Sequence, residues 1–356
     1  FFLKILRAGR PVMPKLLFTL GVITLSLASG YTIQRLTASG RLHLSGDPVQ
    51  LRRRMQMVAL FGCLPASAML SLWGMPAPEA RLLTLPLLGL FSWTAGGLLA
   101  VGLSHGLRLD ASQTGSMFCC GAFTNIGAVG GFVCVLYLGE QSIALVALYR
   151  LCEEFFYFGV AYPVAKAYGE RNKTPAPARD EIPETPTSPR RELLRAVLAA
   201  FRHVGGDPVI RLVLGALLLG VTLNLAGVPR FPGAGTLASG CMLAATVLFL
   251  TAIGMSLRIS RIRAYTRQWL CIALIKFLLV PVSVTGLAWL CGLGTVDDGL
   301  PLRTVFVLSA MPVAMNALVP PSLFSLDLDL ANTCWICTTA SLIVVLPIAA
   351  ALLPLL

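Results

Sequence analysis

Charged side chains are scarce in this chain of 356 residues: Asp, Glu, Lys and Arg make up 12% of it, whereas hydrophobic residues make up 56%. A soluble protein of this length carries far more charge, so the composition excludes an ordinary soluble globule. The mean hydropathy of +0.79 agrees with that exclusion. We expect a multi-pass protein embedded in the lipid bilayer of a plasma membrane or a bacterial inner membrane.

Alternation of apolar and polar residues is missing from the hydrophobic stretches, which are continuous runs. Membrane-spanning helices are continuous runs of ~20 apolar residues, whereas the strands of membrane barrels alternate. The sequence therefore predicts an all-α protein with about ten spans. The expected spans are 14–36, 55–74, 82–103, 113–138, 142–168, 208–228, 235–257, 268–291, 302–325 and 330–354.

Acidic residues are few, 16 against 28 Lys and Arg, which gives a net charge of +12. This excess does not indicate a nucleic-acid partner, because the basic residues gather in loops, where Lys and Arg determine membrane orientation. The basic loops after spans one, five and seven lie on one side, which we assign to the cytoplasm. Both chain ends are then outside, although the basic segment 1–13, which could be a short amphipathic interfacial helix, favours the opposite orientation.

Histidine is rare as well, and His43, His105 and His203 all lie in loops or at the ends of spans. The ten cysteines fall inside predicted spans, where cysteine usually packs as a small apolar residue. Cys334 and Cys337 form a CxxC pair, but no second pair accompanies them. Packing explains this pair better than redox or metal chemistry, so neither a metal site nor a cofactor is expected.

One long polar stretch, 169–206, mixes prolines with charges of both signs and reads as a flexible cytoplasmic linker. It separates 1–168 from 207–356, and each half holds about five predicted spans. Matching spans of the two halves are offset by about 190 residues. Because five is an odd number, the second half must enter the membrane from the opposite side, which predicts an inverted-topology repeat.

Two apolar segments at matching positions of the halves, 121–132 and 309–321, contain residues that interrupt helices. Glycine weakens a helix interior and proline removes a backbone donor, so each segment should unwind near its Asn. Paired interrupted helices are a sequence signature of the binding site of secondary transporters. The alternative is that these residues only permit close helix packing. Two breaks in register, each with an Asn, favour a crossing site.

Helix ends at such a crossing would offer free N–H groups to a carboxylate or free carbonyl groups to a cation. The amides of Asn125 and Asn316 can donate or accept hydrogen bonds, and we expect them to orient a carboxylate. The candidate substrate-binding residues at the two breaks are Thr124, Asn125, Ile126, Gly127, Met315, Asn316 and Ala317.

Ionisable side chains inside spans are costly and are therefore candidates for function. Arg150 precedes Glu153 and Glu154 by three and four residues, so one Glu can pair with it on the same helix face. The other Glu could carry a proton or meet a cation, whereas a purely structural ion pair near the membrane interface fits equally well. Lys276 could attract an anionic substrate, neutralise a Glu, or extend to the cytoplasmic surface.

Four stretches, in their order and spacing, carry a likeness to a known family over nearly the whole chain. They are 14–31, which ends in Gly-Tyr; 249–257, which reads FLTAIGMSL; 123–131; and 310–318 followed by the acidic turn 327–329. In these stretches the chain resembles the auxin efflux carrier family, which includes plant auxin exporters and bacterial permeases for small carboxylates. It departs from many members by having Gly131-Phe132 where they place a proline after the fourth-span break.

The resemblance implies ten helices in two inverted repeats, with broken helices four and nine crossing as in bile-acid symporters and sodium/proton antiporters. It implies a scaffold of helices one, two, six and seven, a transport domain of the others, an elevator-type movement and a homodimer. It also implies that Asn125, Pro312 and Asn316 are crossover positions that contact the substrate.

The leading interpretation is a secondary carrier for a small organic anion or carboxylate, coupled to protons through Glu153 or Glu154, and not an enzyme. The alternative is a sodium-coupled organic-anion symporter of the bile-acid type. An intramembrane protease is a further alternative, suggested by the adjacent glutamates, but such proteases need His within helices. A non-transporting membrane sensor would not require two breaks in register.

Overall fold

The computed structural model describes residues 12–41, 47–75, 79–173, 208–255 and 262–356. Within these ranges the protein is helical, without strands apart from one isolated β-bridge. Residues 1–11 of the expected amphipathic segment 1–13 and residues 174–206 of the expected linker 169–206 lie outside the described residues. Helix α10 (Tyr162–Lys173) extends into the first residues of that linker range.

Five helices in the described ranges are long and apolar enough to cross a membrane, or six if one bent pair counts as a single span. They are Leu17–Ala38, Pro48–Trp73, Ala80–Gly106, Ala234–Gly254 and Ile262–Leu290, with the pair Leu328–Ala340 and Leu342–Leu355 bent by 49°. These helices agree with the all-α membrane protein that the composition predicts. The other predicted spans are shorter or interrupted.

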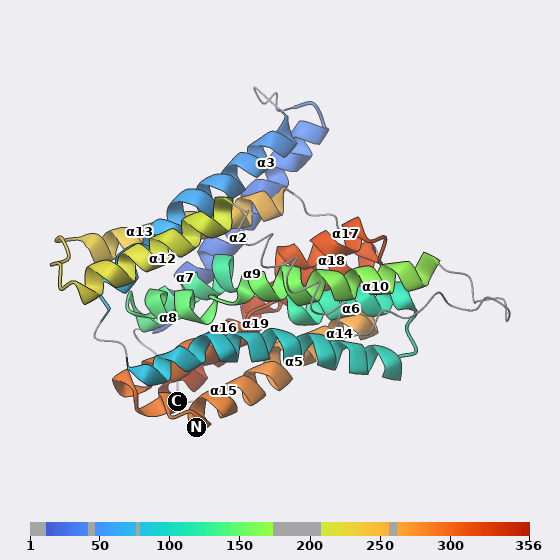
Figure 1. Cartoon of the computed structure of the whole chain (residues 1–356). Coiled ribbons are helices and arrows are strands. Elements are labelled where there is room, and N and C mark those ends of the chain that lie inside the picture. Colours follow the sequence, from blue (N-terminus) through green and yellow to red (C-terminus); the bar gives the residue numbers. More distant parts are fainter. Residues whose placement is uncertain (1–11, 42–46, 76–78, 174–207, 256–261) are drawn as a thin grey trace.

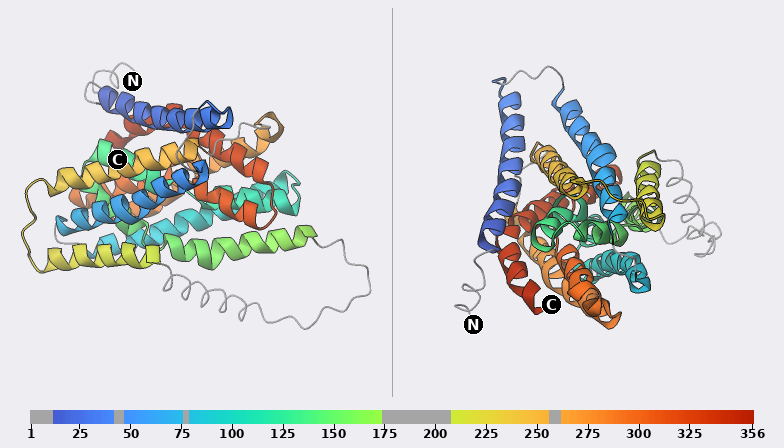
Figure 2. Two further views of the ribbon diagram at one scale, coloured as in Figure 1. Left: turned by 90° about the horizontal axis from the view of Figure 1, so that it is seen from above. Right: turned by 90° about the vertical axis from the view of Figure 1, so that its left-hand side faces the viewer.

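One group of helices packs around α13 (Ala234–Gly254). It contains α2 (Val12–Ala38) and the long helix that runs from α3 (Pro48–Met57) through η1 (Val58–Cys63) into α4 (Leu64–Trp73), and α12 (Pro208–Leu225) packs on α4. The right-hand view of Figure 2 shows α13 between α2 and this long helix. Small residues allow the close approach, because a Cβ added to Gly30 of α2 would lie 2.0 Å from the carbonyl oxygen of Thr251.

A second group contains α5 (Leu85–Gly106), which packs along α6 (Ala111–Ala122), and α15 (Val280–Leu290), which packs on α16 (Leu300–Ser309). Helix α14 (Thr266–Leu274) joins α15 through the wide turn η6 (Ile275–Leu279), and α5, α14 and α15 lie together along the lower edge of Figure 1. At the contact of α5 with α6, Gly96 faces Gly121. A Cβ on Gly96 would lie 2.2 Å from the carbonyl oxygen of Gly121.

Two predicted spans are interrupted at the places where Gly, Pro and Asn suggested a break. Helix α6 ends at Ala122, and helical structure resumes with η3 (Ile126–Gly130) and α7 (Gly131–Leu138). Likewise α16 ends at Ser309 and resumes with η9 (Met315–Leu318) and α17 (Val319–Leu323). The non-helical residues are 123–125 and 310–314.

Two more interruptions correct the expectation of continuous helices over 142–168 and 330–354. Helix α8 (Ser142–Tyr149) is separated from α9 (Glu153–Phe156) at 150–152, where the amide of Glu153 turns back to the carbonyl of Arg150. Helices α18 (Leu328–Ala340) and α19 (Leu342–Leu352) meet at Ser341. The hydroxyl of Ser341 donates to the carbonyl of Cys337 at 2.8 Å, a type of bond that tends to bend helices.

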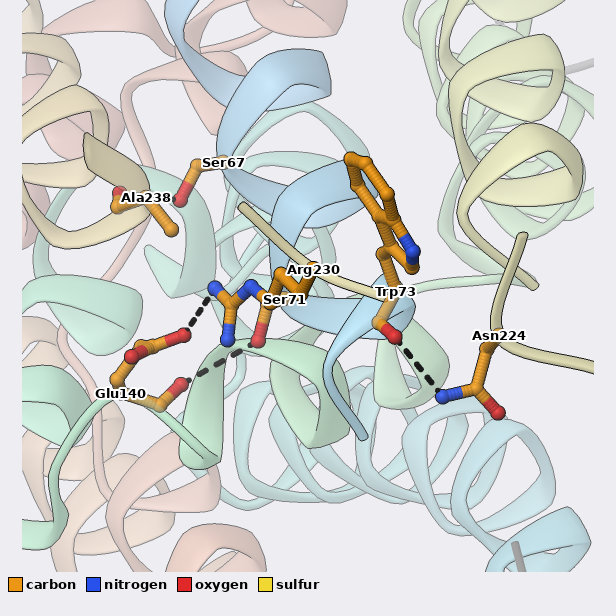
Figure 3. A network of polar contacts seen from close by, with 7 residues as sticks. All are labelled: Ser67, Ser71, Trp73, Glu140, Asn224, Arg230 and Ala238. Atoms are coloured by element: carbon orange, nitrogen blue, oxygen red, sulfur yellow. Dashed lines mark hydrogen bonds and ion pairs between the residues drawn. The ribbon is translucent and has the colours of Figure 1, made fainter. Parts of the chain in front are cut away.

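Polar contacts join α4 and the loop after α12 to the turn between α7 and α8, and α12 to the end of α4 (Figure 3). The side chain of Arg230, between α12 and α13, forms an ion pair with Glu140, in the turn between α7 and α8. The hydroxyl of Ser71 on α4 donates to the backbone carbonyl of Glu140 at 3.3 Å. Asn224 of α12 donates to the carbonyl of Trp73 at 3.0 Å, which fixes the end of α4.

Candidate functional site

The two central interruptions meet each other in the interior of the protein. The backbone amide of Asn125 donates to the backbone carbonyl of Pro312 at 2.9 Å, and the backbone amide of Ala314 donates to the backbone carbonyl of Phe123 at 3.1 Å. These bonds flank Thr124 and Val313, which form the isolated antiparallel bridge. The breaks therefore satisfy part of each other's freed backbone, as a non-aqueous environment requires.

The bridge is deeply buried and is held from a third helix. Phe123, Thr124 and Asn125 are 0%, 3% and 5% exposed, and Val313 is 0% exposed. The amide of Val313 donates to the hydroxyl of Thr338 on α18 at 3.2 Å, and that hydroxyl donates to the carbonyl of Cys334 at 2.8 Å. Unwound backbone at this depth is held in place by protein groups.

Lys276 of η6 ends directly on this bridge. Its ammonium donates to the hydroxyl of Thr124 at 2.7 Å, and the residue is 1% exposed. The expectation that Lys276 could extend to the cytoplasmic surface is therefore wrong, because the long-range contact with Thr124 holds the chain inside. In the described part of the chain no carboxylate lies within ion-pair distance of it. An amino group with spare N–H donors thus lies at the bridge, and it is positively charged when protonated.

A second charged cluster lies at the interruption between α8 and α9. Arg150 forms an ion pair with Glu153 through Nε, and the hydroxyl of Tyr157 donates to the other carboxylate oxygen at 3.0 Å. The ring of Tyr157 stacks on that of Phe123 with centroids 4.0 Å apart. Of the two glutamates, Glu153 is the one that pairs with Arg150, and it is linked through Tyr157 to the first break.

Arg150 also covers the one accessible point of the first break. Residues 114–134 are buried except for Gly127, which is half-buried. A Cβ added to Gly127 would lie 2.8 Å from Nη1 of Arg150. The guanidinium therefore lies over the start of the half-helix that begins at Ile126, where free N–H groups favour an anion.

A cavity of about 100 Å³ adjoins this guanidinium. Arg150, Glu153 and Glu154 form its polar side, and the remaining lining residues are apolar or proline. The apolar wall comes from several elements, including Leu64 of α4, Ile143 of α8 and Leu214 of α12. The cavity thus lies between α4, α12 and α13 on one side and the helices α8 and α9, which flank the interruption at 150–152, on the other.

The sequence-predicted residues are brought together only in part. Thr124, Asn125 and Pro312 share the bridge, whereas Asn316 is exposed and Met315 is half-buried. The expectation that the side-chain amides of Asn125 and Asn316 face one site is not met here, since Asn125 is buried and Asn316 is exposed. Ile126 and Ala317 are fully buried packing residues.

Two contributors were not identified from the sequence. Tyr157 follows Glu153 by four residues, and this helical spacing could have suggested the contact. Thr338 carries no such signal, because it reaches Val313 from another helix.

No known protein family matches the chain, and no curated protein matches it in sequence. The function is therefore inferred from the sequence pattern and from the geometry described above.

Proposed function

We propose that the protein is a secondary carrier that moves a small organic anion across the membrane. The observation that carries this proposal is the buried antiparallel bridge between two interrupted helices, with the ammonium of Lys276 against it. Broken helices that meet in a membrane protein commonly build a midplane binding site, and a buried charge without a carboxylate partner is costly unless it has a function.

The arrangement of the helices supports an inverted repeat of ten spans. The interruptions at 123–125 and 310–314 are separated by about 190 residues, and so are those at 150–152 and Ser341. This pairing is what two copies of one five-helix unit would produce. The likeness to the auxin efflux carrier family supports the same repeat, with the linker in the cytoplasm, both ends outside and a homodimer.

The packing supports an elevator-type movement. Helix α13 packs on α2 and α4, and α4 packs on α12, so these four helices would form the static scaffold, whereas the bridge lies among α6, α7, α16 and α18. The moving part would carry Asn125, Pro312 and the substrate past the scaffold.

Coupling to protons is the version that we favour. Both carboxylate oxygens of Glu153 are engaged, by Arg150 and by Tyr157, so Glu153 holds the structure of the cluster. Glu153 and Glu154 both line the cavity and are the candidates for proton transfer. When it is protonated, Lys276 supplies a positive charge at the bridge, which reduces the need for a sodium ion there.

Uptake of labelled carboxylates into proteoliposomes tests the proposal. The wild-type protein should take up at least one carboxylate faster than empty liposomes do. Asn125→Ala should abolish this uptake, because it removes the buried side-chain amide that we expect to orient the carboxylate and keeps the backbone bond to Pro312. Asn316→Ala should reduce it if the exposed amide meets the substrate during the cycle. Gln268→Ala, an amide on α14 away from both breaks, is the matched control. Normal uptake in both Asn variants would overturn the proposed site.

A further inference from the structure

The cavity beside Arg150 has the composition of a site for one charged group with an apolar body. Its charged residues, Arg150, Glu153 and Glu154, come from one short stretch of chain, and the walls from α4 and α12 are apolar. An organic ligand placed there would meet charge at one end only. A second charged group on the ligand would be left against leucine side chains without a partner, which is costly.

The polar end has an unused hydrogen-bonding edge. Nε of Arg150 is taken by Glu153, whereas no acceptor for Nη1 and Nη2 is found among the described residues. A guanidinium presents paired N–H groups in a fixed fork that matches the two oxygens of a carboxylate. These donors lie over Gly127, the one accessible residue of the first break. A carboxylate bound here would touch the break from the cavity.

The volume of the cavity limits the size of the apolar part of a ligand. A cavity of about 150 Å³ in another protein holds a benzene molecule. The cavity described here has about 100 Å³. It therefore suits a short alkyl chain better than an aromatic ring.

We propose that this cavity binds a short-chain alkyl monocarboxylate, with the carboxylate on the free edge of Arg150 and the alkyl chain between α4 and α12. Glu153 and Tyr157 are positioning residues, because they hold the guanidinium in this orientation. The charge of Glu154 lies close enough to interact with Arg150 and opposes the anion. This inference rests on the proposed function and names the substrate class of the same carrier.

Binding can be measured directly on the purified full chain in detergent by isothermal titration calorimetry, with valerate as the probe. Glutarate, benzoate and pentylamine test a second carboxylate, a ring and an organic cation. Valerate should bind at least tenfold more tightly than each of them. Tighter binding of glutarate, benzoate or pentylamine would overturn the assignment.

Two kinds of variant locate the site. Ala147→Leu adds volume inside the cavity without changing its charges and should weaken valerate binding at least tenfold. The matched control is Ala340→Leu, which fills a separate apolar cavity between α2 and α18 and should leave binding unchanged. Equal affinity in Ala147→Leu and wild type would contradict the proposed position of the alkyl chain.

The role of the Arg150 charge is tested with a double variant, which does not leave Glu153 as a buried charge without its partner. Arg150→Gln combined with Glu153→Gln removes the ion pair as a unit and should abolish valerate binding, whereas Glu154→Gln should strengthen it severalfold. Retained binding in the double variant would refute the role of Arg150. If the wild type transports another carboxylate and does not bind valerate, this inference fails while the carrier function stands. If no carboxylate is transported, the proposed function itself fails.

Discussion

At the scale of single residues, the most informative side chain is Lys276. A lysine that is 1% exposed and whose ammonium donates to the hydroxyl of Thr124 has lost most of its hydration. Removing a charge from water costs several kcal/mol, on the order of what a whole domain gains on folding. A side chain kept at such a cost is more readily explained by binding an anion than by stabilising the fold.

Replacing Lys276 with Met should therefore separate function from stability. We expect uptake of the carboxylate to fall at least about tenfold, because a charged hydrogen bond contributes about 1.5–3 kcal/mol. The melting temperature should stay the same or rise, since a buried charge is replaced by an apolar chain of similar length. Lys276→Arg, which keeps the charge, is the control. Uptake at the wild-type rate in Lys276→Met would contradict the role of the ammonium.

At the scale of secondary-structure elements, the decisive feature is the pairing of the two interruptions. Thr124 and Val313 lie between the two backbone hydrogen bonds of the bridge, so they form a pair without hydrogen bonds of its own. In such pairs the Cα atoms are about 4.5 Å apart, a separation within the range that a disulfide can span.

A double variant, Thr124→Cys with Val313→Cys, should form a disulfide within one chain when the membrane-embedded protein is oxidised. Mass spectrometry of the digested protein would identify the linked peptides. The native cysteines are all free thiols, so they are replaced first. Ala122→Cys with Val313→Cys serves as the control pair. Absence of the link between 124 and 313, or equal linking in the control, would show that the interruptions do not face each other.

The contact of α5 with α6 gives a second test at this scale. Gly96→Ala places a methyl group against the backbone of Gly121, and we expect it to destabilise the protein by about 1–3 kcal/mol. Gly102 lies on the same helix with nothing within 4 Å of an added Cβ. Gly102→Ala should raise the free energy of unfolding by about 0.4–1 kcal/mol, so the melting temperature should stay the same or rise slightly. Equal melting temperatures in the two variants would contradict the close approach.

The sequence predicts a structural feature when the residues that cause it lie close together in the chain, and it fails when the cause is a contact with a distant residue. The interruptions near Asn125 and Pro312 were predicted, because Gly, Pro and Asn act on their own stretch of backbone. The interruption after Tyr149 was missed, since residues 150–152 include neither Gly nor Pro. The depth of Lys276 was also beyond prediction, because it depends on Thr124, which is 152 residues away along the chain.

At the scale of the whole molecule, the ion pair of Glu140 with Arg230 joins the turn between α7 and α8 to the loop between α12 and α13 (Figure 3). Glu140 precedes α8, whereas Arg230 belongs to the loop between α12 and α13. In the proposed elevator-type movement Glu140 would move past Arg230, and this pair would have to separate.

Glu140→Gln should change the rate of transport by a modest factor, roughly two- to fivefold, because a half-exposed ion pair contributes up to about 1 kcal/mol. The direction depends on whether opening or closing of this end limits the cycle. Lys166→Gln is the matched control, since Lys166 pairs with Glu170 inside the single helix α10. An identical rate in Glu140→Gln and wild type would show that this pair is not broken during transport.

Counterflow in proteoliposomes is the most direct test of the proposed carrier function. Vesicles are loaded with an unlabelled carboxylate, and the entry of the same carboxylate in labelled form is followed with no imposed ion gradient. A carrier that exposes one site alternately to each side predicts faster entry into loaded vesicles than into empty ones, with this stimulation lost in Lys276→Met. Entry that is independent of the internal carboxylate, for every carboxylate tried, would contradict the proposal that this protein is a carrier.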